Sequence, residues 1–207
     1  AAAALVGSLA HLGRPGMAWK AFRNLRRSWL SREVALFGLY APLAALAVLV
    51  PGAAPVAAAV GVVGVYASAR LYIVPGRPSW DSPLTIASFA ATGLAIGPVI
   101  TGALPLAAAG VTLSLVALVA NIWRLRGDAR VAHGGTPQLY LHRLRTWTVT
   151  RVVLGAAGLA AVLLGAAWVA VVVLLAAEVV GRWLFYVTVV PANMPGSFWR
   201  HTAGSHR

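Results

Sequence analysis

Long apolar runs, separated by short segments rich in proline, glycine and arginine, make up most of this chain. A helix needs roughly 20 apolar residues to cross a hydrocarbon core of ~30 Å, and six of the runs approach that length. The six predicted spans cover about 33–50, 55–74, 84–104, 105–123, 147–164 and 167–190. The last two adjoin at 165–166, where we expect a turn, because one helix over both runs would be far longer than the bilayer is thick.

The first twelve residues form a further apolar run, which is too short to span a membrane. We interpret it as the end of a helix whose beginning is missing. A signal peptide is the alternative, but no charged residues precede the run, and GRPG at 13–16 follows where a cleavage site of small residues would lie. The predicted fold is therefore all-α, a polytopic transmembrane bundle of six full helices and one truncated helix in a single domain over 1–207.

Composition supports a membrane protein, because 60% of the residues are hydrophobic and only 10% are charged. That leaves too little polar surface for a water-soluble domain. The net charge of +13 is compatible with nucleic-acid binding, but a membrane protein more often uses arginine to fix its orientation, and we predict no nucleic-acid partner. Lysine and arginine gather in alternate connections, at 13–32, 70–77, 124–145 and 182–207, which places that side of an inner-membrane protein in the cytoplasm.

Several kinds of cofactor ligand and catalytic motif are absent from the sequence. There is no cysteine, so the chain offers no thiolate to an iron–sulfur cluster or a structural zinc. A transmembrane haem needs facing histidines inside the helices, whereas His133, His142, His201 and His206 lie in predicted loops or the tail. We therefore expect no haem and no metal in this chain. Motifs of ATPases and hydrolases are missing as well.

The basic connection before the first full span carries the candidate chemistry. Aromatic and aliphatic residues recur there at helical spacing among basic ones, namely Trp19, Phe22, Leu25 and Trp29. This pattern predicts an amphipathic segment in the headgroup layer of the membrane. His11, at the start of the connection, can exchange protons near neutral pH, although a carbonyl or water partner would account for it equally well.

Two acidic residues fall within the predicted spans. Glu33 lies in the first turn of its helix, where the positive end of the helix dipole is by itself enough to favour a carboxylate. Glu178 lies inside an apolar run, and Arg182 follows one turn later, so the two are placed to form an intramembrane ion pair. Such a pair is either functional, as in a small transporter or channel, or purely structural.

Five segments in order along the chain carry a resemblance to a known family. They are HLGRPGMAWKAFRNLRRSWLSRE at 11–33, ARLY with the downstream PSWDSPLT, IGP at 96–98, E-x-x-GR-x-x-FY at 178–186, and VVPANMPGSFW towards the end. Together they resemble the dimethyl sulfoxide reductase anchor subunit (DmsC) family. The resemblance implies an eight-helix membrane anchor, surrounded by membrane lipid and bound to a molybdopterin catalytic subunit and a four-cluster iron–sulfur subunit, which hold the metal centres.

The resemblance also implies a site for a quinone, menaquinone or ubiquinone, beside the iron–sulfur subunit. We expect this site to contain His11, Gly13, Arg14 and Glu33. In it His11 would be the hydrogen-bond partner or proton acceptor, and Glu33 would relay the proton. A separate docking surface for the partner subunits, or for lipid headgroups, is expected at Lys20, Arg23, Arg26 and Arg27.

The strongly basic connection differs from the dimethyl sulfoxide reductases, whose enzyme faces the periplasm. It is similar to the branch that anchors cytoplasm-facing enzymes, such as membrane-bound sulfite dehydrogenases. We therefore predict an anchor that passes electrons between the quinone pool and the iron–sulfur subunit. Two alternatives remain at this point: a transporter or channel that uses Glu178 and Arg182, and a purely structural anchor in which changes at His11 and Glu33 affect assembly only.

Overall fold

The structure, a computed structural model, describes residues 15–131 and 135–192. These residues contain no strand, and six of their helical segments are long and apolar enough to cross a membrane. The six are α2 (Trp29–Leu49), η2 with α3 (Pro51–Tyr72), α4 (Pro83–Ile100), α5 (Leu104–Arg126), α7 (Arg145–Leu163) and α8 (Ala167–Val187). The predicted all-α fold with six membrane-spanning helices is confirmed. The chain divides into two compact units, 1–71 and 72–207, which we describe separately.

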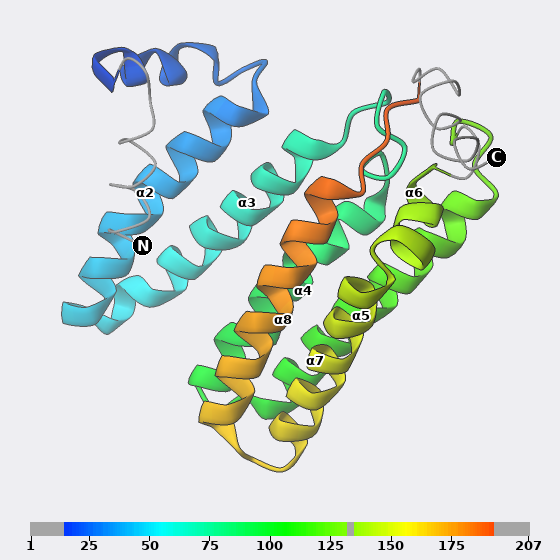
Figure 1. The fold of residues 1–207 in the computed structure, drawn as a ribbon. Helices are drawn as coiled ribbons and strands as arrows, with labels where there is room; N and C mark the ends of the chain where they lie inside the picture. Colours follow the sequence, from blue (N-terminus) through cyan, green and yellow to red (C-terminus); the bar gives the residue numbers. More distant parts are fainter. Residues whose placement is uncertain (1–14, 132–134, 193–207) are drawn as a thin grey trace, which may run out of the picture. The chain divides into compact units, whose positions relative to one another are not determined.

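In the first unit, a 3₁₀ helix, η1 (Pro15–Asn24), runs across the end of α2 (Figure 1). Ser28 begins α2, since its hydroxyl accepts a hydrogen bond from the Ser31 backbone N–H at 3.3 Å. This cap starts α2 four residues earlier than the sequence pattern predicted. Trp29 is therefore the first residue of the helix and not part of the basic connection, and Glu33 lies in the second turn, beyond the main reach of the helix dipole.

Helices α2 and α3 (Ala54–Tyr72) meet along a seam of aromatic rings and glycines. A Cβ atom at Gly61 would lie 3.1 Å from the Tyr40 ring, and one at Gly64 would lie 3.3 Å from the Phe37 ring. Where no side chain intervenes, the rings pack directly against the α3 backbone. Nearer the basic connection, the Trp29 ring makes an edge contact with Tyr66 at 5.9 Å between centroids. The seam thus fixes the first two spans as a hairpin.

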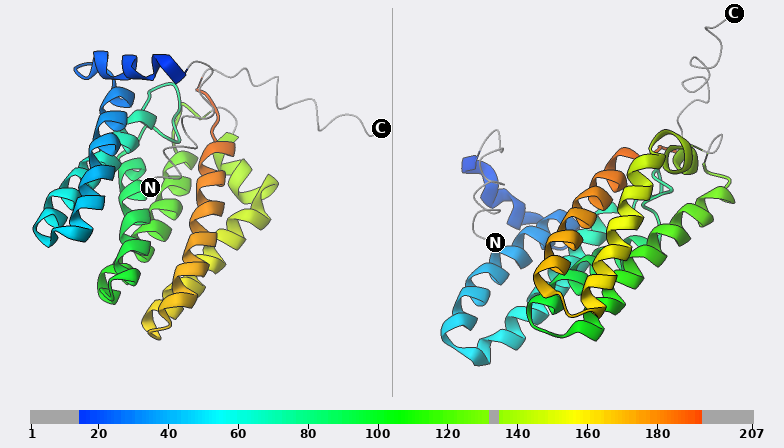
Figure 2. Two further views of the ribbon diagram at one scale, coloured as in Figure 1. Left: turned by 90° about the vertical axis from the view of Figure 1, so that its left-hand side faces the viewer. Right: turned by 60° about the horizontal axis from the view of Figure 1, so that its bottom comes forward.

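The second unit is an antiparallel four-helix bundle (Figures 1 and 2). Helix α4 packs against α5 and α8, and α7 packs against the same two helices. The turns α4–α5 and α7–α8 contain Gly102 (φ 77°) and Gly165 (φ 72°), left-handed conformations that glycine adopts without strain. The turn expected at 165–166 is therefore present. At the other end of the bundle lie the short α6 (Gly135–Gln138) and the π-helical turn η4 (Leu139–Arg143).

Small residues let the bundle helices approach closely. Membrane helices associate largely through van der Waals packing, which small interface residues favour. Gly110 is the closest approach of α4 and α5, because a Cβ atom there would overlap the backbone carbonyl carbon of Leu94. Gly158 plays the same part between α7 and α8, where a Cβ would overlap Leu174 Cδ2. The backbones themselves are in contact at α4–α5.

Gly110→Ala should therefore destabilise the bundle, even though alanine is the better helix former. Backbone cannot move aside as a flexible side chain can, so α4 and α5 must separate, at a cost of about 1–3 kcal/mol. The thermal midpoint of the protein in detergent measures this loss. Gly93→Ala on α4 is the matched control, because a Cβ there would have no atom within 4 Å. Equal midpoints for the two variants would contradict the close contact.

Candidate functional site

A cluster of charged and hydroxyl side chains lies halfway along the helices of the second unit. The Glu178 carboxylate, on α8, accepts a hydrogen bond from Arg151 Nη2 on α7 at 2.5 Å. Two hydroxyl groups also donate hydrogen bonds to this carboxylate, Thr92 Oγ1 on α4 at 2.7 Å and Ser114 Oγ on α5 at 3.2 Å. Arg151 also donates to Ser114 at 2.6 Å. All four helices of the bundle therefore meet at one carboxylate.

Two glycines make room for the Arg151 guanidinium between α7 and α8. A Cβ atom at Gly181 would lie 2.6 Å from Arg151 Nε, and one at Gly155 would lie 3.2 Å from Nη1. Gly181 stands one helical turn after Glu178, on the same face of α8. The E-x-x-G spacing of the sequence thus supplies both the negative charge and the space for its positive partner. Arg151 and Glu178 are both buried, with 4% and 8% of their surfaces exposed.

Arg182 is not the direct partner of Glu178. The i,i+4 spacing suggested that pair, but the structure joins Glu178 to Arg151, which comes from a neighbouring helix. Arg182 Nη2 instead donates to Thr92 Oγ1 at 2.9 Å, and its guanidinium lies 3.8 Å from the centroid of the Phe89 ring. Because Thr92 in turn donates to Glu178, Arg182 is linked to the carboxylate through one hydroxyl.

A small cavity adjoins this cluster and extends towards the end of the bundle where α5 and α8 end. Its volume is about 50 Å³, enough for one or a few water molecules but far below the 300–1,000 Å³ typical of ligand pockets. Its lining includes Ser88, Ser114, Asn121, Arg151 and Glu178. Of the N–H groups of Arg151, only those on Nη2 donate hydrogen bonds to residues that the structure describes. The cavity therefore has room for water molecules that accept hydrogen bonds from the other N–H groups of Arg151. A quinone ring does not fit there.

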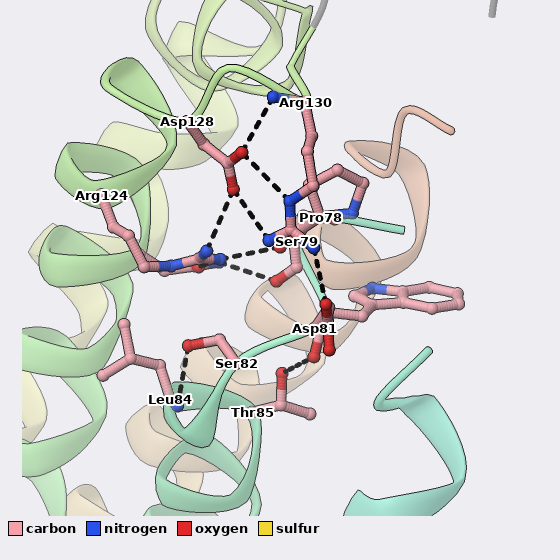
Figure 3. A network of polar contacts seen from close by, with 11 residues as sticks. Pro78, Ser79, Asp81, Ser82, Leu84, Thr85, Arg124, Asp128 and Arg130 are labelled. Carbon is pink, nitrogen blue, oxygen red and sulfur yellow. Dashed lines mark hydrogen bonds and ion pairs between the residues drawn. The ribbon is translucent and has the colours of Figure 1, made fainter. Parts of the chain in front are cut away.

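A second polar network closes the basic end of the bundle (Figure 3). Arg130 bridges two acids, donating to Asp81 Oδ2 at 2.6 Å and to Asp128 Oδ2 at 3.0 Å. Arg124, at the end of α5, donates to the Pro78 carbonyl at 2.7 Å and approaches Asp128 at 3.4 Å. The network therefore ties the segment that leads into α4 to the segment that follows α5.

The PSWDSPLT segment, residues 78–85, makes further hydrogen bonds that connect the helices of the bundle. Besides Asp81, its Ser82 caps α4 by accepting from the Leu84 N–H at 3.2 Å, and Thr85 Oγ1 donates to the Trp80 carbonyl at 2.7 Å. The Trp80 indole donates to the Phe185 carbonyl at 3.0 Å. One short segment thus holds α4, α5 and α8 together.

The carboxyl of Asp128 has a lowered pKa. The first cause is its hydrogen bonding to the Arg130 side chain, and the charge of Arg124 adds to it. A carboxyl whose pKa is lower when folded contributes stability that is present at neutral pH and is lost only as the pH falls through the folded value. Since an unperturbed aspartate titrates near 3.9, this contribution should persist to about pH 4.

Asp128→Asn should lower the thermal midpoint of the protein at pH 7 and at pH 5 by similar amounts. Below about pH 4 the difference from wild type should shrink, because the carboxyl of the unfolded wild-type chain then binds a proton and the folded state progressively loses this contribution. Thermal melts in detergent at a series of pH values measure the difference. A gap that narrows already between pH 7 and pH 5 would contradict the lowered pKa.

Aromatic rings surround the same end of the second unit. Trp80 stacks on Phe185 with 5.2 Å between centroids, and the Tyr72 and Tyr186 hydroxyls are hydrogen-bonded at 2.8 Å. Such rings are common where a helix leaves the hydrocarbon core. The FY of the E-x-x-GR-x-x-FY segment therefore belongs to this aromatic cluster, while its glutamate, glycine and arginine belong to the buried one.

The residues expected at a quinone site are only partly within the described chain. His11, Gly13 and Arg14 lie outside the described residues. Glu33 is partly buried in the second turn of α2, and among the described residues it has no hydrogen-bond or ion-pair partner. That these four residues form one site stays a prediction.

The basic residues expected to dock a partner are all exposed. They are Lys20 and Arg23 on η1, and Arg26 and Arg27 between η1 and α2. Arg32 holds this segment by donating to the carbonyls of Leu25 at 2.8 Å and Arg26 at 2.7 Å. A cationic surface with a fixed backbone thus lies at the start of α2.

Sequence reasoning overlooked Arg151, Thr92 and Ser114. Arg151 was placed inside the fifth span without a role, although a lone arginine within an apolar run is a signal of a buried partner. Thr92 and Ser114 gave no such signal, because membrane helices commonly carry hydroxyls that bond to their own backbone.

Comparison with known proteins places the chain in a family. A model of the DMSO reductase anchor subunit (DmsC) family matches residues 2–136. The chain is also similar to a sulfite dehydrogenase subunit of Allochromatium vinosum, with 31% identity over 192 residues, covering 75% of this chain and 58% of that protein. The chain thus spans little more than half of this curated relative. No solved structure matches it significantly. The match over more than half of the chain shows that it belongs to the DMSO reductase anchor subunit (DmsC) family and is a multi-pass membrane protein.

Proposed function

We propose that this chain is the quinone-interacting membrane anchor of a molybdopterin oxidoreductase complex. In that role it passes electrons between the quinone pool and an iron–sulfur subunit. The observation that carries the proposal is membership of the DmsC family. The likeness to a sulfite dehydrogenase subunit favours the branch of the family whose enzymes face the cytoplasm.

The proposed partners hold the metal centres. They are a molybdopterin catalytic subunit and a four-cluster iron–sulfur subunit, which carries electrons to the membrane. The chain itself lacks cysteine, so it can give such clusters no thiolate ligand. Its part is to hold the iron–sulfur subunit near a quinone, menaquinone or ubiquinone, at the membrane surface.

The quinone site is proposed at His11, Gly13, Arg14 and Glu33. A quinone that takes up two electrons must also take up two protons, and a quinol must release them, so the site needs a group that exchanges protons at neutral pH. The imidazole of His11 has a suitable range. Glu33 supports the proposal as a relay, since it is a carboxyl in an apolar helix without a partner among the described residues.

The docking side is proposed to be cytoplasmic, in the inner membrane. The end of the second unit that carries Arg124, Arg126, Arg130 and Arg145 is opposite the uncharged turns at Gly102 and Gly165. An arginine-rich end and an arginine-free end are the pattern of the positive-inside rule. By the same rule, the basic residues of η1 would face the cytoplasm, where the proposed partner subunit would bind.

Neutralising part of this surface should weaken docking without unfolding the chain. Arg23→Gln with Arg26→Gln removes two exposed charges, each worth well under 1 kcal/mol in an ion pair, so retention of the iron–sulfur subunit should fall about fivefold. Co-purification at a series of salt concentrations measures it. Arg143→Gln with Arg145→Gln is the control with the same charge change. If both pairs weaken retention equally, the loss reflects the positive charge of the protein in general and not a docking surface on η1.

A further inference from the structure

The face of α5 that points away from the bundle core carries an apolar groove. Its volume is about 380 Å³. The side chains that line it are Leu115, Val116, Val119, Ala120 and Trp123. Val119 and Trp123 are 60% and 74% exposed, although they belong to a helix that crosses the membrane. The groove therefore opens to the hydrocarbon.

A second cavity, of about 270 Å³, lies at the basic end of the same helix and has polar side chains at its edge. It is lined by Arg126, Pro137, Gln138, Leu141 and His142. Arg126 and His142 are exposed, and neither side chain has an ion-pair or hydrogen-bond partner in the part of the chain that the structure describes. The π-helical turn η4 brings this wall to α5: Tyr140 points into the core, and the adjoining Leu141 packs against the cluster that contains Ile122.

The groove and the second cavity lie along the same face of α5. Val119, Trp123 and Arg126 follow one another at i, i+4 and i+7, which places them on one face of α5. From Leu115 to Arg126 the helix rises ~16 Å at ~1.5 Å per residue. One leaflet supplies about half of a ~30 Å hydrocarbon core, so the two sites together are as long as a lipid in a single leaflet.

The charges of the residues that line the groove and the second cavity indicate which class of lipid binds there. No acidic residue lines either cavity, and the second cavity presents a guanidinium, an imidazole and an amide beside its apolar lining. These groups match a phosphate with a net negative charge, for which arginine is the preferred side chain. A zwitterionic headgroup also carries a phosphate, but its ammonium group cancels the net negative charge that is attracted to Arg126.

We propose that this face of α5 binds one anionic phospholipid, with its phosphate between Arg126 and His142 and one acyl chain in the groove beside Trp123. The lipid is bound as a structural partner and takes no part in electron transfer. The assignment is independent of the quinone site and of the partner subunits.

Native mass spectrometry of the purified subunit with its partners tests the assignment. Phosphatidylglycerol and phosphatidylcholine are added in turn to delipidated protein. Wild type should retain phosphatidylglycerol preferentially, and Arg126→Gln should reduce that retention about fivefold, the effect of one cation at an anionic headgroup. Arg145→Gln, which removes a charge at the same end but lines neither cavity, should leave it unchanged.

A second variant tests the tail site without a change of charge. Ala120→Phe fills the groove and should lower retention of phosphatidylglycerol, whereas Val153→Phe, on the exposed surface of α7, should not. Thermal midpoints equal to that of wild type show that each variant is folded. Equal retention of the two lipids, or no loss in either Arg126→Gln or Ala120→Phe, would overturn the proposal. Competition by inorganic phosphate at the lipid's concentration would show a site for free anions and would overturn it too.

Discussion

Glu178→Leu is expected to lower strongly the amount of folded protein found in the membrane. The substitution leaves the Arg151 guanidinium buried between two helices without its carboxylate, and Ser114 alone cannot neutralise it. Removing one member of a buried ion pair costs about 3–5 kcal/mol. That is a large share of a typical stability of about 5–15 kcal/mol. Arg151→Leu should destabilise the protein by a similar amount, since it leaves the Glu178 carboxylate buried without its positive partner.

Two further variants test whether the unpaired buried charge is what destabilises the bundle. The double variant Arg151→Leu/Glu178→Leu should recover most of the lost stability, because no buried charge is left unpaired. Arg182→Leu should cost clearly less than either single change, since Arg182 is only partly buried and reaches Glu178 through Thr92. The amount of protein in membranes and its thermal midpoint in detergent measure these effects. A double variant no better than the single ones would contradict the account of this pair.

His11→Ala is expected to lower quinone-linked turnover of the assembled complex by roughly 100-fold or more, the usual scale for the loss of a general acid or base. Glu33→Gln should slow the same step, because an amide cannot relay a proton. Turnover with a soluble artificial electron acceptor should stay normal in both variants, since that route bypasses the membrane. Comparison of the two assays on one preparation measures the effect.

His133→Ala, which changes a histidine far along the sequence, is the matched control. An assembled His11→Ala complex with full quinone-linked turnover would contradict the role given to His11. Loss of the partner subunits in both His11→Ala and Glu33→Gln, without a selective loss of quinone turnover, would mean that these residues serve assembly and that quinone binds elsewhere.

The spans were predictable from sequence because crossing a membrane imposes a length and a hydrophobicity that are read along the chain. The residues at which the spans begin and end were less predictable. The pattern placed the start of the first span at Glu33, but Ser28 caps the helix and starts it at Trp29. An N-cap depends on one local hydrogen bond, which cannot be inferred from hydrophobicity averaged over a stretch of residues.

The buried cluster shows a different limit. Glu178 was recognisable as unusual, since it stands alone in an apolar run, but its partner was not. The i,i+4 rule finds neighbours on one helix and selected Arg182, whereas the bundle brings Arg151 from α7 into the space beside Gly181. Which helices are adjacent is a property of tertiary packing.

The most direct test of the proposed anchor function is to isolate the tagged subunit from its native membranes under gentle solubilisation. Mass spectrometry and metal analysis then identify what accompanies it. The account predicts an iron–sulfur protein together with molybdenum or tungsten in the same fraction. Recovery of the subunit alone and without metal, in a preparation that keeps other respiratory complexes intact, would contradict it and would favour a transporter built around Glu178.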